Sequence, residues 1–172
     1  MSSTTARVSL RDYQLALSER LQSAQAGAGA SSKLGMRVGG EAWLVDLAEA
    51  GEVIRVPPIA LVPLAQPWFK GVANVRGNLY SVTDFSAFVG GKPMPMSEHA
   101  RLLIVAERFR AGAALLVECL LGLRSAESFT PQAGAAAQSW VRAQFSDSEG
   151  QVWKELDVAA LVQNEAFLEV SV

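Results

Sequence analysis

The sequence predicts a mainly β protein in which two small β-barrels pack face to face, with a helix near each end of the chain. Short apolar–polar alternations separated by glycine and proline turns recur along most of the chain, a spacing typical of barrels and sandwiches. In addition, residues 77–89 can be laid over residues 150–162 without a gap. Each copy has a turn glycine, a short strand with a central aromatic residue, an aspartate and an apolar helix. The repeated unit suggests two similar barrels.

Composition limits the classes of function that the chain can serve. Its 172 residues, half of them hydrophobic, allow one domain of ordinary size or two small subdomains that share a core. The formal net charge is -2 and the isoelectric point is about 5.5. Nucleic-acid-binding proteins usually carry a basic excess, because phosphate neutralisation supplies much of their affinity. We therefore expect no nucleic-acid partner. A barrel that binds single-stranded nucleic acid ranks third among the functional hypotheses, after the two that are given below.

The cysteine content and the N-terminal sequence indicate where the protein works. Cys119 is the single cysteine, so no intramolecular disulfide can form, which fits a reducing compartment. Residues 1–7 lack the apolar run of a secretory signal, and no apolar stretch reaches the ~20 residues that cross a bilayer. We expect a soluble cytoplasmic protein without direct membrane insertion.

Residues 9–25 are predicted to form an amphipathic helix. Ser9 is a suitable N-cap, with Asp12 three residues later in a pattern like a capping box. We favour packing of this helix on its own domain, and binding to a partner is the alternative. Residues 25–32 are rich in Ala, Gly and Ser, as in a flexible linker, so residues 1–33 form an N-terminal extension. The apolar residues of the helix fall on one stripe at helical spacing: Leu10, Tyr13, Leu17 and Leu21.

Residues 34–56 are expected to supply three strands. Leu34, Met36 and Val38 alternate with small or charged residues, as in a half-buried strand. Gly39-Gly40 is a two-residue hairpin signal, and residues 42–47 return as the second strand. The third strand covers residues 52–56, because two prolines follow it directly.

Residues 68–85 combine two strands, a turn and the start of a helix. Trp68 and Phe69 lead into the first strand and are expected in the core, Arg76-Gly77-Asn78 make a tight turn, and the return strand ends at Asp84. Glycine and asparagine accept the positive φ that such turns require. Aspartate favours a helix N-cap because its carboxylate accepts backbone N–H groups of the first turn. The stretch therefore holds the charge of Arg76 on a rigid corner.

The second half of the chain is expected to hold further strands and a terminal helix. The loop at residues 92–97 is interpreted as a joint between subdomains. A helical turn at residues 125–129 and an alanine-rich loop at residues 132–138 come before the last two strands. Residues 157–167 form the terminal helix. The predicted strands are residues 101–107, residues 113–124 with a bend at Gly122, residues 140–145 and residues 151–156.

No pattern of catalytic, metal-binding or cofactor-binding residues stands out in the sequence. His99 and Cys119 could form a nucleophilic pair, but the histidine is expected in a loop and the cysteine in an apolar strand, where cysteine is commonly a small buried hydrophobe. One histidine and one cysteine cannot make a structural zinc site alone. We expect no enzyme activity, no cofactor and no metal, and a small-molecule-binding or Cys/His-dependent β-barrel is the alternative function.

A motif in the central stretch resembles the signature of the CheW-like family. It runs Phe69-Lys70-Gly71-Val72-Ala73-Asn74-Val75-Arg76-Gly77 and is followed by Ser81-Val82-Thr83-Asp84-Phe85. Residues 34–38 and 43–47 are similar to the opening hairpin of that family, and residues 102–105 and 112–124 to its second-subdomain strands. The similarity covers residues 34–162. The chain departs from the signature where Ser81 replaces a proline and where Val75 and Phe85 replace leucines.

The resemblance implies two five-stranded, SH3-like β-barrels over residues 34–172, and a scaffold rather than an enzyme. CheW-like proteins couple methyl-accepting chemoreceptors to a CheA-type histidine kinase in bacterial chemosensory arrays, so both are implied as partners. Arg76 and Glu52 would lie on the receptor-facing surface, where Gly71 would allow close approach. The implied protein-binding residues are Glu52, Gly71, Asn74, Val75, Arg76 and Gly77.

A finer resemblance comes from Leu10-Arg11-Asp12-Tyr13-Gln14 and from the divergent core. These features are similar to the twitching-motility adaptors of the family. They imply a PilJ-type receptor, a ChpA-type kinase and control of type IV pili. They also imply a cytoplasmic location beside membrane-bound receptor arrays.

Overall fold

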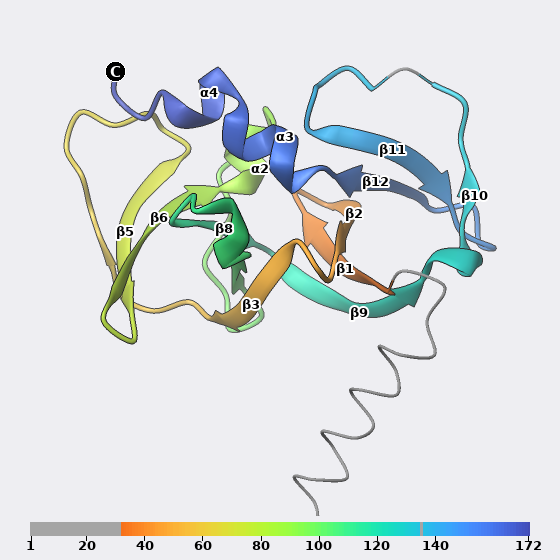
Figure 1. Cartoon of the computed structure of the whole chain (residues 1–172), viewed down its shortest axis with the longest axis horizontal. Helices are drawn as coiled ribbons and strands as arrows, with labels where there is room; N and C mark the ends of the chain where they lie inside the picture. Colours follow the sequence, from red (N-terminus) through yellow and green to blue (C-terminus); the bar gives the residue numbers. More distant parts are fainter. Residues whose placement is uncertain (1–31, 135) are drawn as a thin grey trace, which may run out of the picture. The chain divides into compact units, whose positions relative to one another are not determined.

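The computed structural model describes residues 32–134 and 136–172, and the helix predicted at residues 9–25 lies outside them. The described residues form two sheets of six strands each (Figure 1), which confirms the mainly β prediction. Sheet A contains β1 (Ser32–Val38), β2 (Glu41–Asp46), β9 (Cys119–Ser125), β10 (Thr130–Pro131), β11 (Val141–Ser146) and β12 (Val152–Leu156). Sheet B contains β3 (Ala50–Arg55), β4 (Ile59–Ala60), β5 (Phe69–Val75), β6 (Asn78–Asp84), β7 (Arg101–Val105) and β8 (Ala113–Val117).

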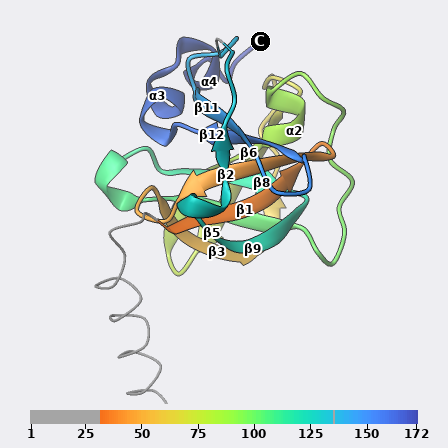
Figure 2. The same cartoon turned by 90° about the vertical axis from the view of Figure 1, so that its right-hand side faces the viewer.

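Each sheet has five strands of five to seven residues, and the sixth, β4 or β10, has two. Short helices lie between and after the strands, and α2, α3 and α4 gather on one side of the sheets in both Figure 1 and Figure 2. Among the described residues, no helix has the length and apolar character that crossing a membrane requires. The helices are α2 (Phe85–Phe88), α3 (Val158–Gln163) and α4 (Glu165–Leu168), with 3-10 turns at η1 (Glu107–Phe109) and η2 (Ala126–Ser128).

Two copies of one topological unit build both sheets. The first copy runs from β1 to α2 and the second from β7 to α3. In each copy the first two strands form a hairpin in one sheet, and the next four strands lie in the other sheet. The strand order across sheet B, β4-β5-β6-β8-β7-β3, therefore matches the order across sheet A, β10-β11-β12-β2-β1-β9. Because the two hairpins are exchanged, each sheet needs strands from both copies.

The sequence repeat marks the ends of these two copies. Asp84 and Asp157 are the N-caps of α2 and α3, as predicted, and accept hydrogen bonds from Ala87 N at 3.1 Å and from Ala160 N at 3.0 Å. Asp84 is the last residue of β6 and Asp157 directly follows β12. Each of these strands pairs in parallel with a strand of the exchanged hairpin, β6 with β8 and β12 with β2. The predicted repeat is therefore a structural repeat.

Tryptophan residues extend the repeat beyond the matched sequence. The backbone N–H of Asp84 donates to Trp68 O at 2.8 Å, and that of Asp157 donates to Trp140 O at 2.7 Å. Each tryptophan precedes a strand, β5 or β11, that is interrupted by a register shift after its first residue. The two tryptophans thus hold equivalent positions.

The strand predicted at residues 113–124 differs from the structure. Glu118 divides the strand predicted at residues 113–124 into β8 and β9, which belong to different sheets. The Glu118 N–H donates to Arg37 O at 3.0 Å, and its carboxylate accepts from Gly40 N at 3.2 Å, so contacts with the β1–β2 hairpin hold the crossing point. At Gly122 the strand has a β-bulge, where the register against β1 shifts.

The loop at residues 92–97 connects α2, which follows β6 of sheet B, to β7 of the same sheet. It joins the two copies of the topological unit and not the two sheets, because the chain crosses between the sheets at residues 47–49 and at Glu118. The loop is attached to sheet B by Met94, which is 5% exposed and whose N–H donates to Asp84 Oδ2 at 2.8 Å.

The terminal helix predicted at residues 157–167 is broken into α3 and α4. Asn164 has extended backbone angles, φ -73° and ψ 128°. Its side chain accepts a hydrogen bond from Phe167 N at 3.3 Å and so caps α4. The asparagine ends one helix and starts the next.

Aromatic side chains around α2 join the two sheets. The Phe88 ring lies 5.1 Å from the Trp68 ring, 5.1 Å from the Trp140 ring and 5.4 Å from the Phe167 ring, measured between centroids. The main core likewise contains buried residues from strands of both sheets. Trp68 and Phe69 were expected in the core and are half-buried. Burial of this aromatic surface favours one continuous body over two separate sheets.

Candidate functional site

The turn between β5 and β6 forms an exposed corner of sheet B. Val75 pairs with Asn78, which leaves Arg76 and Gly77 as a two-residue turn. Their φ angles are 51° and 86°, the pair of positive values that a type I′ hairpin requires. Asn74 Oδ1 accepts a hydrogen bond from Gly77 N at 2.9 Å, which fixes the turn from the inside. The rigid corner predicted for Arg76 is therefore present.

Arg76 and Glu52 form a two-point ion pair across sheet B. Arg76 Nη1 donates to Glu52 Oε2 at 2.8 Å, and Nη2 donates to Oε1. Glu52 belongs to β3 at one edge of the sheet, so the pair attaches the β5–β6 turn to a distant edge strand. These hydrogen bonds lower the pKa of Glu52 and raise the pKa of Arg76. The Arg76 side chain is still 69% exposed, so its outer face is available to another protein.

Gly71 is required by a contact inside the protein. Its φ is 131°, and a Cβ atom there would lie 2.0 Å from Ala60 O. Ala60 belongs to β4, which pairs with β5 next to Gly71. The close approach that the sequence suggested at Gly71 is therefore made by the chain's own backbone.

Val75 supports the corner from below. Its side chain is 9% exposed and lies in a core cluster with Ala73 and Val82. Four predicted residues, Glu52, Asn74, Arg76 and Gly77, thus meet at the exposed corner, whereas Val75 and Gly71 hold its base.

An open groove lies beside the corner, and the sequence analysis did not identify it. Its volume is about 570 Å³, and its lining includes Glu52 on β3, Leu79 and Tyr80 on β6, Glu107 on η1 and Arg110. Leu79 is 68% exposed and adds apolar surface to the groove. No local sequence signal indicates the groove, because its lining comes from β3, β6 and the segment around η1, which are far apart in the chain. The groove places apolar surface and charges of both signs next to Arg76.

The alternative catalytic pair is not assembled. His99 precedes β7 of sheet B, and its imidazole contacts Glu98 Oε1 at 3.5 Å. Cys119 lies in β9 of sheet A and is absent from the concave site that His99 lines. Among the described residues, no group of three His, Cys, Asp or Glu side chains is arranged to hold a metal ion.

Comparison with protein families identifies the family of this chain. The model of the CheW-like domain matches residues 33–166. The chain belongs to the CheW-like family. The resemblance carried by the residues around Arg76 is thereby confirmed, and the two exchanged sheets are this chain's version of a CheW-like domain.

Individual relatives agree with this assignment. The CheW-like chain is 33% identical over 146 residues to Protein PilI of Pseudomonas aeruginosa, covering 82% of this chain and 80% of the relative. It is 28% identical over 88 residues to a probable chemotaxis protein CheW of Rhizobium etli, covering 51% of this chain and 56% of the relative. The crystal structure of the scaffolding protein TtCheW from Thermoanaerobacter tengcongensis has a TM-score of 0.65 at 17% identity, covering 80% of this chain and 95% of the other.

Proposed function

We propose that this CheW-like protein is a non-catalytic adaptor that couples a methyl-accepting chemoreceptor to a CheA-type histidine kinase. The observation that carries the proposal is the exposed Arg76 corner, in which a type I′ turn and the Glu52 carboxylate hold one guanidinium group in a fixed position. A fixed charge favours specific recognition, because less side-chain freedom is lost on binding. The receptor contacts the outer face of Arg76 and the adjoining groove at Leu79.

The two-sheet architecture fits an adaptor for a second reason. A body in which both sheets share a core keeps surfaces on sheet A and sheet B at a fixed separation. Each contact can then be weak alone, because many copies in an array add their contributions. We place the receptor contact on sheet B and assign the kinase to other surfaces of residues 34–172, with residues 1–33 as an extension.

The similarity to Protein PilI over most of both chains supports a more specific assignment. We propose that the array is one that controls type IV pili and twitching motility, with a PilJ-like receptor and a ChpA-like kinase. The adaptor then works on the cytoplasmic side of membrane-bound receptors.

Reversing the charge at Arg76 tests the receptor contact. We expect Arg76→Glu to weaken binding to an immobilised cytoplasmic receptor fragment about ten-fold or more, with an unchanged circular dichroism spectrum. Lys154→Glu is the matched control, because Lys154 also pairs with an exposed carboxylate, Glu41, but lies on sheet A. Normal receptor binding by Arg76→Glu would remove Arg76 from the site.

A charge-swapped variant separates two roles of the ion pair. Arg76→Glu combined with Glu52→Arg keeps an ion pair at the corner but reverses the charge at the turn. If Arg76 contacts the receptor directly, the double variant stays defective. Recovery of binding would mean that the pair only shapes the turn.

A further inference from the structure

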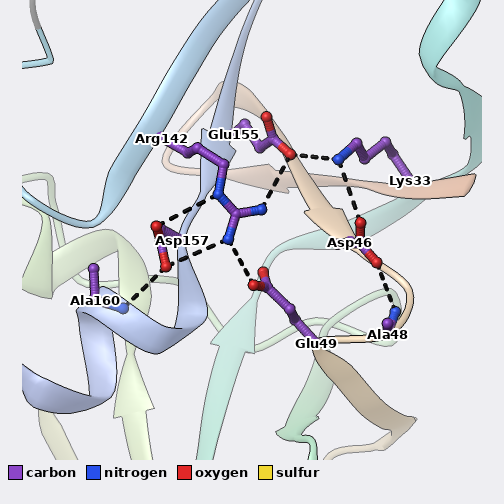
Figure 3. A network of polar contacts seen from close by, with 8 residues as sticks. All are labelled: Lys33, Asp46, Ala48, Glu49, Arg142, Glu155, Asp157 and Ala160. Carbon is purple, nitrogen blue, oxygen red and sulfur yellow. Dashed lines mark hydrogen bonds and ion pairs between the residues drawn. The ribbon is translucent and has the colours of Figure 1, made fainter. Parts of the chain in front are cut away.

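A group of charged side chains connects sheet A to the first strand of sheet B. The network (Figure 3) joins strands β1, β2, β11 and β12, the N-terminus of α3 and the residue before β3. Several members are buried, with side-chain exposures of 5% for Glu155 and 9% for Glu49. Its charged members are Lys33, Asp46, Glu49, Arg142, Glu155 and Asp157.

Arg142 is the centre of the network. Its Nη1 lies 3.5 Å from Glu155 Oε1, and its Nη2 lies 3.4 Å from Asp157 Oδ1 and 2.6 Å from Glu49 Oε1. Burial disfavours the Arg142 cation, but the hydrogen bonds with Glu49 and Asp157 outweigh this and raise its pKa. The planar guanidinium can serve three carboxylates at once, which an ammonium cannot do with the same geometry.

Glu49 is the one member that leads into sheet B. Its backbone oxygen accepts from Ala106 N at 3.0 Å, at the end of β7, and its side chain is held by Arg142. The second carboxylate oxygen, Oε2, is buried and has no hydrogen-bond partner among the described residues. Arg142 therefore compensates a carboxylate that would otherwise be buried without a cation.

A short segment of backbone connects Glu49 to Glu52, the carboxylate that pairs with Arg76. Residue 51 is a glycine at a register shift between β3 and β7, and a Cβ there would lie 3.1 Å from Ala106 Cα. Such a bulge sets the direction of the next side chain, which is Glu52. Only two residues, Ala50 and Gly51, thus separate the carboxylate that Arg142 holds from the carboxylate that holds Arg76.

The repeat places a lysine of sheet B at the position that Arg142 holds in sheet A, and this lysine lacks the contact with the other sheet. Lys70 occupies the position of Arg142, because each is the residue skipped by the register shift in β5 or β11. Lys70 Nζ lies 3.7 Å from Asp84 Oδ2, the counterpart of the contact between Arg142 and Asp157. Among the described residues, Lys70 makes no ion pair with a residue of the other sheet. The connection through Glu49 is specific to Arg142.

We propose that Arg142 is a positioning residue for the Arg76 corner: by holding Glu49, it fixes the start of β3 and with it the direction of Glu52. The effect on receptor binding rests on the function proposed above. The effect of Arg142 on the geometry of the corner does not rest on that function, because it occurs in the protein with no partner bound.

Arg142→Lys is the variant that tests this inference. The lysine copies the arrangement of Lys70 and Asp84, so the protein is expected to fold, but the contact with Glu49 is lost. In a two-dimensional amide NMR spectrum of the full chain, we expect the signals of residues 50–53 and of Arg76 and Gly77 to shift. Lys154→Gln, which breaks an ion pair on the same sheet, should leave those signals in place. Unchanged signals at Glu52 and Arg76 in Arg142→Lys would overturn the proposal.

Binding to the receptor fragment separates failure of this inference from failure of the proposed function. If both hold, Arg142→Lys shifts the corner signals and weakens binding about five-fold, and Arg76→Glu weakens it further. If the corner signals shift but neither variant changes binding, the positioning role stands and the receptor site is wrong. If Arg142→Lys alters binding without shifting the corner signals, Arg142 acts elsewhere and the positioning role is wrong.

Glu49→Gln provides a second way to lose the ion pair between Arg142 and Glu49. It should shift the same amide signals.

Discussion

Positive φ angles at glycines have two different origins in this protein. At Gly71 the φ of 131° comes with a position for Cβ only 2.0 Å from Ala60 O, whereas at Gly150 the φ is 80° and no atom lies within 4 Å. Alanine at Gly150 therefore meets only backbone strain, and alanine at Gly71 also pushes β4 away from β5.

We expect Gly71→Ala to lower the free energy of unfolding by more than about 4 kcal/mol, a cost reserved for severe clashes. Gly150→Ala is the control and should cost about 1–2 kcal/mol. Chemical denaturation of both variants measures the difference. Equal losses would show that β4 yields easily at this point.

The ion pair at the corner also predicts how pH acts on it. Arg76 lowers the pKa of Glu52, below an ordinary value of about 4.3. A carboxyl with a lowered folded-state pKa adds stability above its unfolded pKa, and this contribution is lost as pH falls through the folded pKa. The pair should therefore remain intact at neutral pH and separate only in acid, below about pH 4.3.

An NMR titration of the Glu52 carboxyl carbon measures this effect. The midpoint should rise in Arg76→Gln, because the hydrogen bonds that favour the charged form are absent. A midpoint that does not move would mean that the ion pair is not formed in solution.

At the scale of elements, the two N-capping aspartates differ although they are equivalent by sequence. Asp84 is fully buried and accepts hydrogen bonds from Ala87 N and Met94 N, whereas the Asp157 side chain is 26% exposed. Loss of a cap costs about 1 kcal/mol, and a buried N–H without a partner costs about 1–3 kcal/mol more.

We therefore expect Asp84→Ala to destabilise the protein by about 2–4 kcal/mol. Asp157→Ala should cost about 1 kcal/mol. Thermal unfolding monitored by circular dichroism compares the two. A larger loss at Asp157 would indicate that its contacts with Arg142 outweigh the cap.

The elements that could be predicted are those with a local signal. The hairpins at Gly39-Gly40 and at Arg76-Gly77 follow from turn residues, and the repeat followed from two aspartates in equivalent positions. The break at Glu118 could not be predicted, because the residues on both sides of it are equally apolar. The choice of sheet at that point depends on contacts with Arg37 and Gly40, which are distant in sequence.

The candidate site shows the same division. Arg76 and Glu52 were placed together by family resemblance, and the turn around Arg76 by local sequence. The reason for Gly71 was not accessible, because it depends on β4, a two-residue strand with no sequence pattern. The groove at Leu79 and the bridge from Arg142 to Glu49 join segments far apart in the chain, so no local pattern indicated them.

For the whole molecule, the exchanged hairpins predict a single cooperative unit. Each sheet requires strands from both copies of the repeat, and aromatic rings around α2 join residues of both sheets. Neither half can bury its own apolar face alone.

Urea unfolding should therefore be two-state, with coincident transitions in tryptophan fluorescence and in far-ultraviolet circular dichroism. A fragment limited to residues 32–89 should not fold. Two resolved transitions in the full chain would show that the sheets are independent domains.

The central claim is that the protein bridges a receptor and a kinase, with the receptor bound at the Arg76 corner. The most direct measurement is retention of a CheA-type kinase on an immobilised cytoplasmic chemoreceptor fragment, with wild-type adaptor, with Arg76→Glu or with Lys154→Glu. The account predicts that wild type and Lys154→Glu retain the kinase, whereas Arg76→Glu does not and yet still binds the kinase directly. Undiminished retention with Arg76→Glu, or no retention with wild type, would contradict it.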